Sequence, residues 1–179
     1  MKLALKLSLT GAYILVIILA NWSIQKWGVV SIGFGLMAPA GVYFAGLAFS
    51  VRDGLHETSN KYWIIAAIII GAGVSYILED GVKVADSAVT TIAVASGVAF
   101  LLSELADFAI YSPLRNRGKM KALLASNAVG LVADSMLFLY LAFGSLEFLR
   151  GQVVAKAYMT LAVIGLMFCY RLYKRSLDK

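Results

Sequence analysis

The sequence predicts an all-α, polytopic membrane protein, a single transmembrane domain over residues 1–179 with six helices and both termini in the cytoplasm. Three observations predict this class: the composition, the recurring apolar runs and the distribution of basic residues. Apolar residues make up 61% of the 179 and charged residues 15%, and the mean hydropathy is +0.83. Soluble domains average about half apolar and about a quarter charged. The composition therefore excludes an ordinary soluble enzyme, a disordered chain and a free nucleic-acid-binding domain.

Six apolar runs are each long enough to cross about 30 Å of hydrocarbon. None of them alternates apolar and polar residues, so helices are favoured over the strands of a barrel. The predicted spans cover residues 7–24, 29–50, 62–78, 88–111, 122–144 and 152–172. Residues that favour turns separate the runs, at Gly28, Asp53–Gly54, Asp80–Gly81, Pro113, Gly118 and Gly151.

The first two spans carry the clearest local signals. The first follows a basic start, Met1–Lys6, that imitates a signal peptide, but no small-x-small cleavage site follows. We therefore interpret this run as the first transmembrane helix. The second span contains Pro39 and Gly41 near its middle, and proline removes a backbone hydrogen bond, so we expect a kinked or broken helix. Broken helices often build substrate sites at mid-membrane, and a kink that serves only packing is the alternative.

The fourth and fifth spans each carry a polar stripe. Glu104 and Asp107 lie one turn apart in the fourth span, and Asn127 and Asp134 share a face of the fifth. A carboxylate that faces lipid costs about 2.5–3.5 kcal/mol, so these acids are expected to face the bundle interior. The loop between the spans is short, which makes them antiparallel neighbours. The pattern predicts a polar pocket that includes Ser126, for which hydrogen-bonded helix packing is the alternative.

The basic residues predict the orientation. Twelve of the 16 lysines and arginines lie at the N-terminus, in the second and fourth loops and in the tail, and four lie in the other segments. The positive-inside rule places both termini in the cytoplasm. This distribution accounts for the net charge of +6 without a nucleic-acid partner.

Other charged residues are candidates for gating. Arg52 and Asp53, at the end of the second span, are expected to gate or pair at the cytoplasmic surface. Arg115 in the fourth loop is a further candidate, and a pair between Arg115 and Asp107 is the alternative to a binding role for this acid. Lys156, just inside the sixth span, is expected to extend outward to the interface.

The sequence indicates no metal, no cofactor and no enzyme. The single Cys169 excludes an internal disulfide, and the single His56 excludes a histidine cluster for zinc. No Ser/His pair, clustered metal ligands or nucleotide-binding fingerprint is present.

The polar motifs of spans two, four and five together resemble a known family. The motifs are Pro39-Ala40-Gly41, Arg52-Asp53, Ser103-Glu104-Leu105-Ala106-Asp107, Tyr111-Ser112-Pro113-Leu114-Arg115, Ser126-Asn127 and Asp134-Ser135. In this order they resemble the VUT family, whose members are also called queuosine precursor transporters. The resemblance implies a multi-pass importer of 7-deazaguanine bases with six helices in the inner (cytoplasmic) membrane. Our first hypothesis is that this transporter acts alone or as a homo-oligomer.

The chemistry of the polar residues fits a guanine-like base. Such a base offers N1–H and an exocyclic amine side by side, and one carboxylate can accept both. Asp134 or Glu104 is the candidate for this carboxylate, and Asn127 can read the O6 or N7 edge. Two other classes stay open: a substrate-capture subunit of an energy-coupling-factor-type vitamin importer, and a membrane protein without a transport function.

Overall fold

The computed structural model describes residues 2–78, 92–114, 116 and 118–177. Within them the chain forms six helices and one two-stranded hairpin. These elements are α1 (Lys2–Trp27), β1 (Val29–Gly33), β2 (Leu36–Pro39), α2 (Val42–Thr58), α3 (Lys61–Leu78), α4 (Ile92–Leu114), α5 (Lys119–Phe143) and α6 (Leu149–Leu177). The residues of the predicted spans that fall at 79–91 lie outside the described part of the chain.

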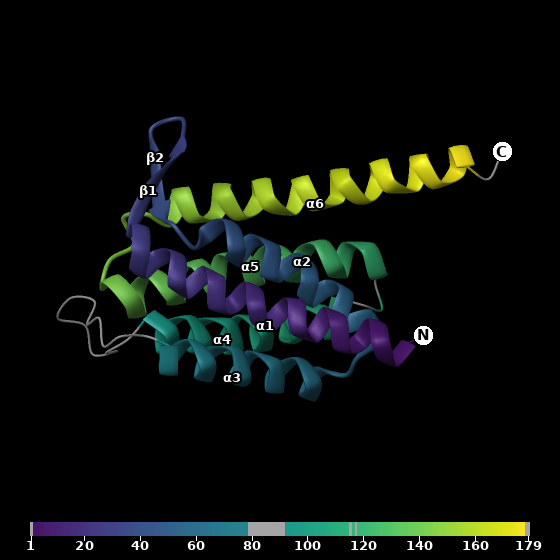
Figure 1. Ribbon diagram of the computed structural model, residues 1–179, viewed down its shortest axis with the longest axis horizontal. Helices are drawn as coiled ribbons and strands as arrows, with labels where there is room; N and C mark the ends of the chain where they lie inside the picture. Colours follow the sequence, from purple (N-terminus) through teal and green to yellow (C-terminus); the bar gives the residue numbers. More distant parts are fainter. Residues whose placement is uncertain (1, 79–91, 115, 117, 178–179) are drawn as a thin grey trace.

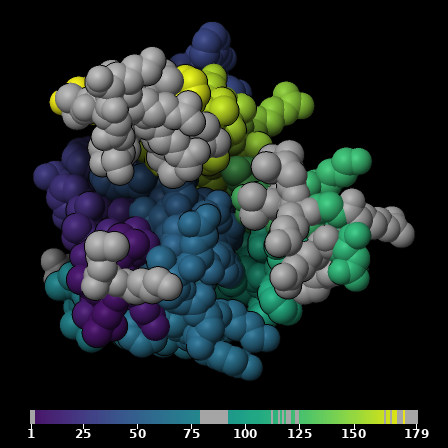
Figure 2. Space-filling view, turned by 90° about the vertical axis from the view of Figure 1, so that its right-hand side faces the viewer, coloured from purple at the N-terminus to yellow at the C-terminus, as the bar shows by residue number. Residues whose placement is uncertain are grey.

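The helices lie side by side along one axis (Figure 1). Both termini lie at the same end of the bundle, which we call the terminal end. The β1–β2 hairpin lies at the opposite end, which we call the hairpin end. Figure 2 looks onto the terminal end, where the blue surface around the start of α3 lies between purple α1 and green α5. The last part of α6 extends past the other helices (Figure 1).

Four of the described helices are long and apolar enough to cross a membrane. These segments are Leu3–Trp27, Lys61–Leu78, Ile92–Tyr111 and Ala125–Phe143. A helical, multi-pass membrane protein is therefore confirmed as the class of this chain. The count of six spans and the cytoplasmic placement of the termini stay predictions.

The second predicted span is partly wrong. Residues 29–39 form an antiparallel hairpin, and the helix begins only at Val42 and continues to Thr58. Pro39 is the last residue of β2, so it does not kink a helix. The reversal at the hairpin tip requires positive φ angles of +93° at Gly33 and +70° at Gly35, which glycine adopts without steric cost. Hydropathy alone does not distinguish this apolar hairpin from a helix.

Two glycines bring backbones into close contact at the hairpin end. A Cβ atom at Gly41, just before α2, would lie 2.2 Å from the carbonyl oxygen of Ala20 in α1. A Cβ atom at Gly151 in α6 would lie 2.0 Å from the carbonyl oxygen of Met37 in β2. The hairpin is therefore packed tightly against the first turn of α6, and α2 starts in direct contact with α1.

Candidate functional site

A buried arginine organises the terminal half of the bundle. Arg52 in α2 is only 3% exposed, and three helices supply its partners. Its Nη1 lies 3.1 Å from Oε2 of Glu104, and its Nη2 lies 3.1 Å from Oδ1 of Asp53. Nη2 also donates a hydrogen bond of 3.1 Å to Oδ1 of Asn127 in α5. The guanidinium thus holds α2, α4 and α5 together, as its fixed fork of donors allows.

Further polar groups complete this network. Nε2 of His56 lies 2.8 Å from Oε1 of Glu104, so both carboxylate oxygens face a nitrogen partner. Nδ2 of Asn127 donates a hydrogen bond of 3.3 Å to Oδ2 of Asp53. Asp107 is more loosely held, with Oδ1 4.0 Å from Arg52. We call this group the Arg52 cluster: Arg52, Asp53, His56, Glu104, Asp107 and Asn127.

The helix sequences explain why these groups meet. Arg52 and His56 are four residues apart in α2, so both face α4 from successive turns. Glu104 and Asp107 are three residues apart in α4. Gly130 of α5 lies against Asp107, since a Cβ atom there would be 3.4 Å from the Cβ atom of Asp107. The small residue lets α4 and α5 approach closely, as is typical of membrane helix pairs.

An open cavity of about 410 Å³ lies beside the Arg52 cluster. Its lining comes from α2, α4 and α5, through Asp53, His56, Glu57, Asp107, Phe108, Tyr111 and Asn127. Sites for small molecules measure about 300–1,000 Å³. The cavity therefore has the size for a small solute and a lining with an excess of carboxylates.

A second ion pair lies deeper in the bundle. Lys156 in α6 is 1% exposed, and its ammonium donates hydrogen bonds to Oδ2 of Asp134 and, at 2.9 Å, to Oγ of Ser135. The expectation that Lys156 extends outward is therefore wrong, because α5 places a carboxylate directly opposite it. The ring of Phe49 contacts both cations, with its centroid 4.7 Å from the Arg52 guanidinium and 5.8 Å from the Lys156 ammonium.

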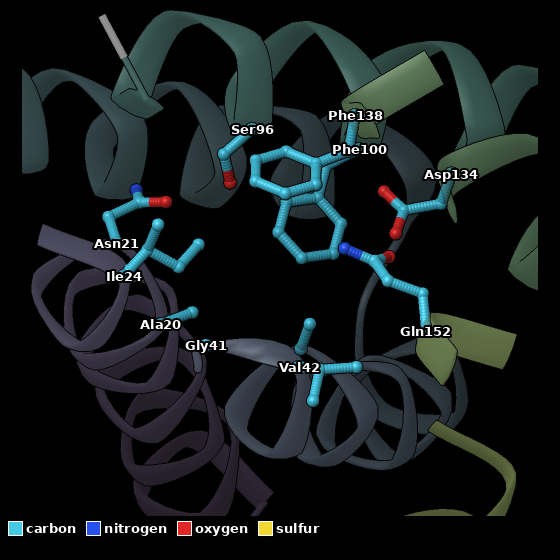
Figure 3. Close-up of a pocket in the computed structure, with 11 residues that line it drawn as sticks. Ala20, Asn21, Ile24, Gly41, Val42, Ser96, Phe100, Asp134, Phe138 and Gln152 are labelled. Atoms are coloured by element: carbon cyan, nitrogen blue, oxygen red, sulfur yellow. The ribbon is translucent and has the colours of Figure 1, made fainter. Parts of the chain in front are cut away.

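Asp134 also borders a small chamber, lined mostly by buried residues (Figure 3). The chamber has a volume of about 20 Å³. In Figure 3, Asn21 and Ser96 lie on one side of it, Asp134 and Gln152 on the other, and Phe100 and Phe138 between them. The starts of α2 and α6 and the end of α1 thus converge on this point.

The structure groups the predicted site residues differently from the sequence pattern. It brings Arg52, Asp53, Glu104, Asp107 and Asn127 into one cluster, and Ser126 is buried beside it on α5. Three other candidates lie elsewhere: Asp134 pairs with Lys156, Gly41 lines the small chamber and Pro39 ends β2. Arg115 lies outside the described residues.

Sequence reasoning missed five polar residues that the structure places at these sites. They are His56, Lys156, Asn21, Ser96 and Gln152. A signal existed for four of them, since Asn21, Ser96, Gln152 and Lys156 are polar residues within predicted spans. Among the residues that the structure describes, no three His, Cys, Asp or Glu side chains are placed to hold a metal ion.

Comparison with known proteins identifies one related family. The family described as "Putative vitamin uptake transporter" matches residues 29–174, which is most of the chain. The match covers the hairpin, α2 and every residue of the Arg52 cluster. The chain matches no curated protein and no solved structure.

Proposed function

Because this chain belongs to the VUT family of vitamin uptake transporters, we propose that it imports a queuosine precursor, a 7-deazaguanine base, into the cytoplasm. The solute passes through the cavity between α2, α4 and α5. The transporter class comes from the family, and the substrate and the site are our proposal. The observation that carries the proposal is the solute-sized cavity lined by carboxylates and an amide.

The contacts that each candidate carboxylate already makes indicate which one is free to bind the base. Glu104 is engaged by Arg52 and His56, and Asp134 by Lys156. Asp107, in contrast, lines the cavity, which neither of the other two acids does, and its contact with Arg52 is the longest in the cluster, at 4.0 Å. We therefore assign to Asp107 the paired acceptance of N1–H and the exocyclic amine, in place of Glu104 or Asp134.

The remaining cavity residues complement the rest of the base. Asn127 lies beside Asp107 in the lining and can both donate and accept hydrogen bonds at the O6 or N7 edge. Phe108 and Tyr111 supply aromatic surface for the flat ring. Arg52 holds Asp53 and Asn127 in position, so it orients the site without having to contact the solute.

Binding to purified protein tests this assignment. 7-Cyano-7-deazaguanine should bind saturably to the wild-type protein, and Asp107→Asn should weaken binding at least about tenfold, since a good bidentate pair is worth about 1–3 kcal/mol. Glu147→Gln, which removes an exposed carboxylate at the hairpin end, is the matched control and should bind normally. Wild-type binding that Asp107→Asn leaves unchanged would overturn the role of Asp107.

Uptake in cells tests whether the chain acts alone. The protein, expressed in a host that lacks energy-coupling ATPase and scaffold subunits, should accumulate or equilibrate the base. Binding without uptake in this host, with uptake restored by the added subunits, would identify a substrate-capture subunit instead. Absence of binding to any deazaguanine by folded protein would refute the proposed substrate.

A further inference from the structure

The only histidine of the chain borders the open cavity and contacts a buried carboxylate. His56 lines the cavity, and its side chain is 37% exposed, so water in the cavity can reach the ring. Its Nε2 lies 2.8 Å from Oε1 of Glu104, whose side chain is only 8% exposed. His56 therefore connects the water of the cavity with the buried pair of Glu104 and Arg52. The proposed function gives this residue no role.

The contact with Glu104 determines where a proton can be added to the ring. A nitrogen and a carboxylate oxygen 2.8 Å apart share a hydrogen, since two lone pairs at this distance would repel each other. Glu104 also lies 3.1 Å from the Arg52 guanidinium, which favours its ionised form, so the hydrogen is on Nε2 of His56. A neutral imidazole carries one hydrogen on its two nitrogens. A further proton therefore adds to Nδ1, and the contact with Glu104 becomes an ion pair.

The surroundings of His56 carry an excess of negative charge. The charged groups of the cavity, the cluster and the rim come from three helices: Arg52, Asp53 and Glu57 of α2, Lys61 of α3, and Glu104 and Asp107 of α4. Two cations thus face four carboxylates, and the net charge is −2 while His56 is neutral. The other buried titratable groups of the described residues add no charge. Lys156 is paired with Asp134, and Tyr13 is a phenol, which is uncharged near neutral pH.

Binding of the base makes this excess of charge more costly. The proposed base is uncharged, and it displaces water that hydrates the carboxylates of the cavity, so the repulsion between these carboxylates increases. A positive charge on His56, 2.8 Å from Glu104, would offset part of this repulsion. Binding of the base and binding of a proton should therefore favour each other, and linkage makes this effect reciprocal.

The chemistry of the cavity assigns the proton to His56. Asp107 has to stay ionised, because only a carboxylate accepts N1–H and the exocyclic amine together. Asp53 and Glu104 each lie 3.1 Å from the buried guanidinium, which disfavours protonation of either. Glu57 is exposed, so water hydrates its charge. Histidine, in contrast, is the side chain that normally changes its charge between about pH 5 and about pH 8.

We propose that the open cavity binds the base together with one proton, which His56 accepts at Nδ1 from water and returns to water when the base leaves. This inference rests on the proposed function and deepens it, since it names the ion that accompanies the solute. Linked binding of this kind is what allows a proton gradient to drive the uptake of an uncharged solute. The affinity for the base should rise as the pH falls from about 8 to about 6, by at most about tenfold per pH unit for one proton.

Calorimetric titration of 7-cyano-7-deazaguanine into the purified protein measures this linkage. Repetition in buffers of different ionisation enthalpy counts the protons taken up per bound base, which should reach up to about one in the wild type near about pH 7. His56→Gln keeps an N–H group beside Glu104 but cannot be protonated, so it should take up no proton and bind independently of pH over this range. His56→Lys carries a fixed charge, so it should also take up none, yet bind more tightly than His56→Gln at about pH 8. Glu147→Gln, which alters an exposed carboxylate outside the cavity, is the control and should keep the proton uptake of the wild type.

The outcomes distinguish this inference from the proposed function. Proton uptake that persists unchanged in His56→Gln would assign the proton to a carboxylate and overturn the role of His56. Binding by the wild type without proton uptake would overturn the linkage and leave the proposed function intact. If folded wild-type protein binds no deazaguanine, the proposed substrate fails and this inference fails with it. Thermal unfolding checks that each variant is folded, and if His56→Gln is not, the proton uptake of His56→Lys decides in the same way.

Discussion

The buried pair of Lys156 and Asp134 has a measurable consequence for stability. Lys156→Met should lower the free energy of unfolding by about 3–5 kcal/mol, because it leaves the Asp134 carboxylate buried without its cation. The double variant Lys156→Met/Asp134→Leu should recover most of this loss. Thermal unfolding in detergent measures both. A double variant that is less stable than Lys156→Met would contradict this account.

The sequence predicted the acids of the site better than their partners. The cost of a carboxylate in lipid was enough to place Glu104 and Asp107 in the bundle interior. Their cation, Arg52, was expected at the cytoplasmic surface, and it is buried among them. Which cation faces which acid depends on the rotation of each helix and on the order of helices around the bundle. The spacing of residues within one helix determines neither the rotation of that helix nor the order of the helices.

At the scale of elements, glycines allow the backbones at the hairpin end to pack in direct contact. Gly151→Ala should destabilise the protein by about 1–3 kcal/mol, because the new Cβ atom would overlap the carbonyl of Met37 and force the hairpin away from α6. Gly11→Ala, on α1 with no atom within 4 Å of the new Cβ, is the control. It should be neutral or stabilising by up to about 1 kcal/mol. Equal effects of the two substitutions on the melting temperature would argue against tight packing here.

The hairpin is also where sequence reasoning about elements failed. The apolar run at residues 29–50 satisfied the length and hydropathy of a helix, yet its first half forms β1 and β2. The decisive information is local: Gly28, Gly33 and Gly35 all adopt positive φ, and β-branched residues precede the turn. The other five predicted runs agree with helices within the described residues. Gly71 and Gly73 have the same spacing in the third run as Gly33 and Gly35, yet neither adopts positive φ and α3 continues through them, so glycine spacing alone does not mark the turn.

At the scale of the molecule, the topology makes a prediction that labelling can check. Phe34 at the hairpin tip is 89% exposed and lies at the end opposite both termini. In a Cys169→Ser background, Phe34→Cys should react with a membrane-impermeant maleimide in intact cells. Tyr62→Cys at the terminal end, also exposed, should react only after permeabilisation. The reverse pattern would invert the predicted orientation.

The Arg52 cluster and the Lys156–Asp134 pair differ in net charge, so the membrane potential acts on them differently. The Arg52 cluster contains one arginine and three carboxylates, so with neutral His56 its net charge is −2. Lys156 and Asp134 together carry none. A unit charge that crosses the full field gains or loses about 2.3 kcal/mol per 100 mV. Movement of the Arg52 cluster during turnover would therefore make the uptake of a neutral base voltage-dependent, whereas movement of the lysine–aspartate pair would be electrically silent.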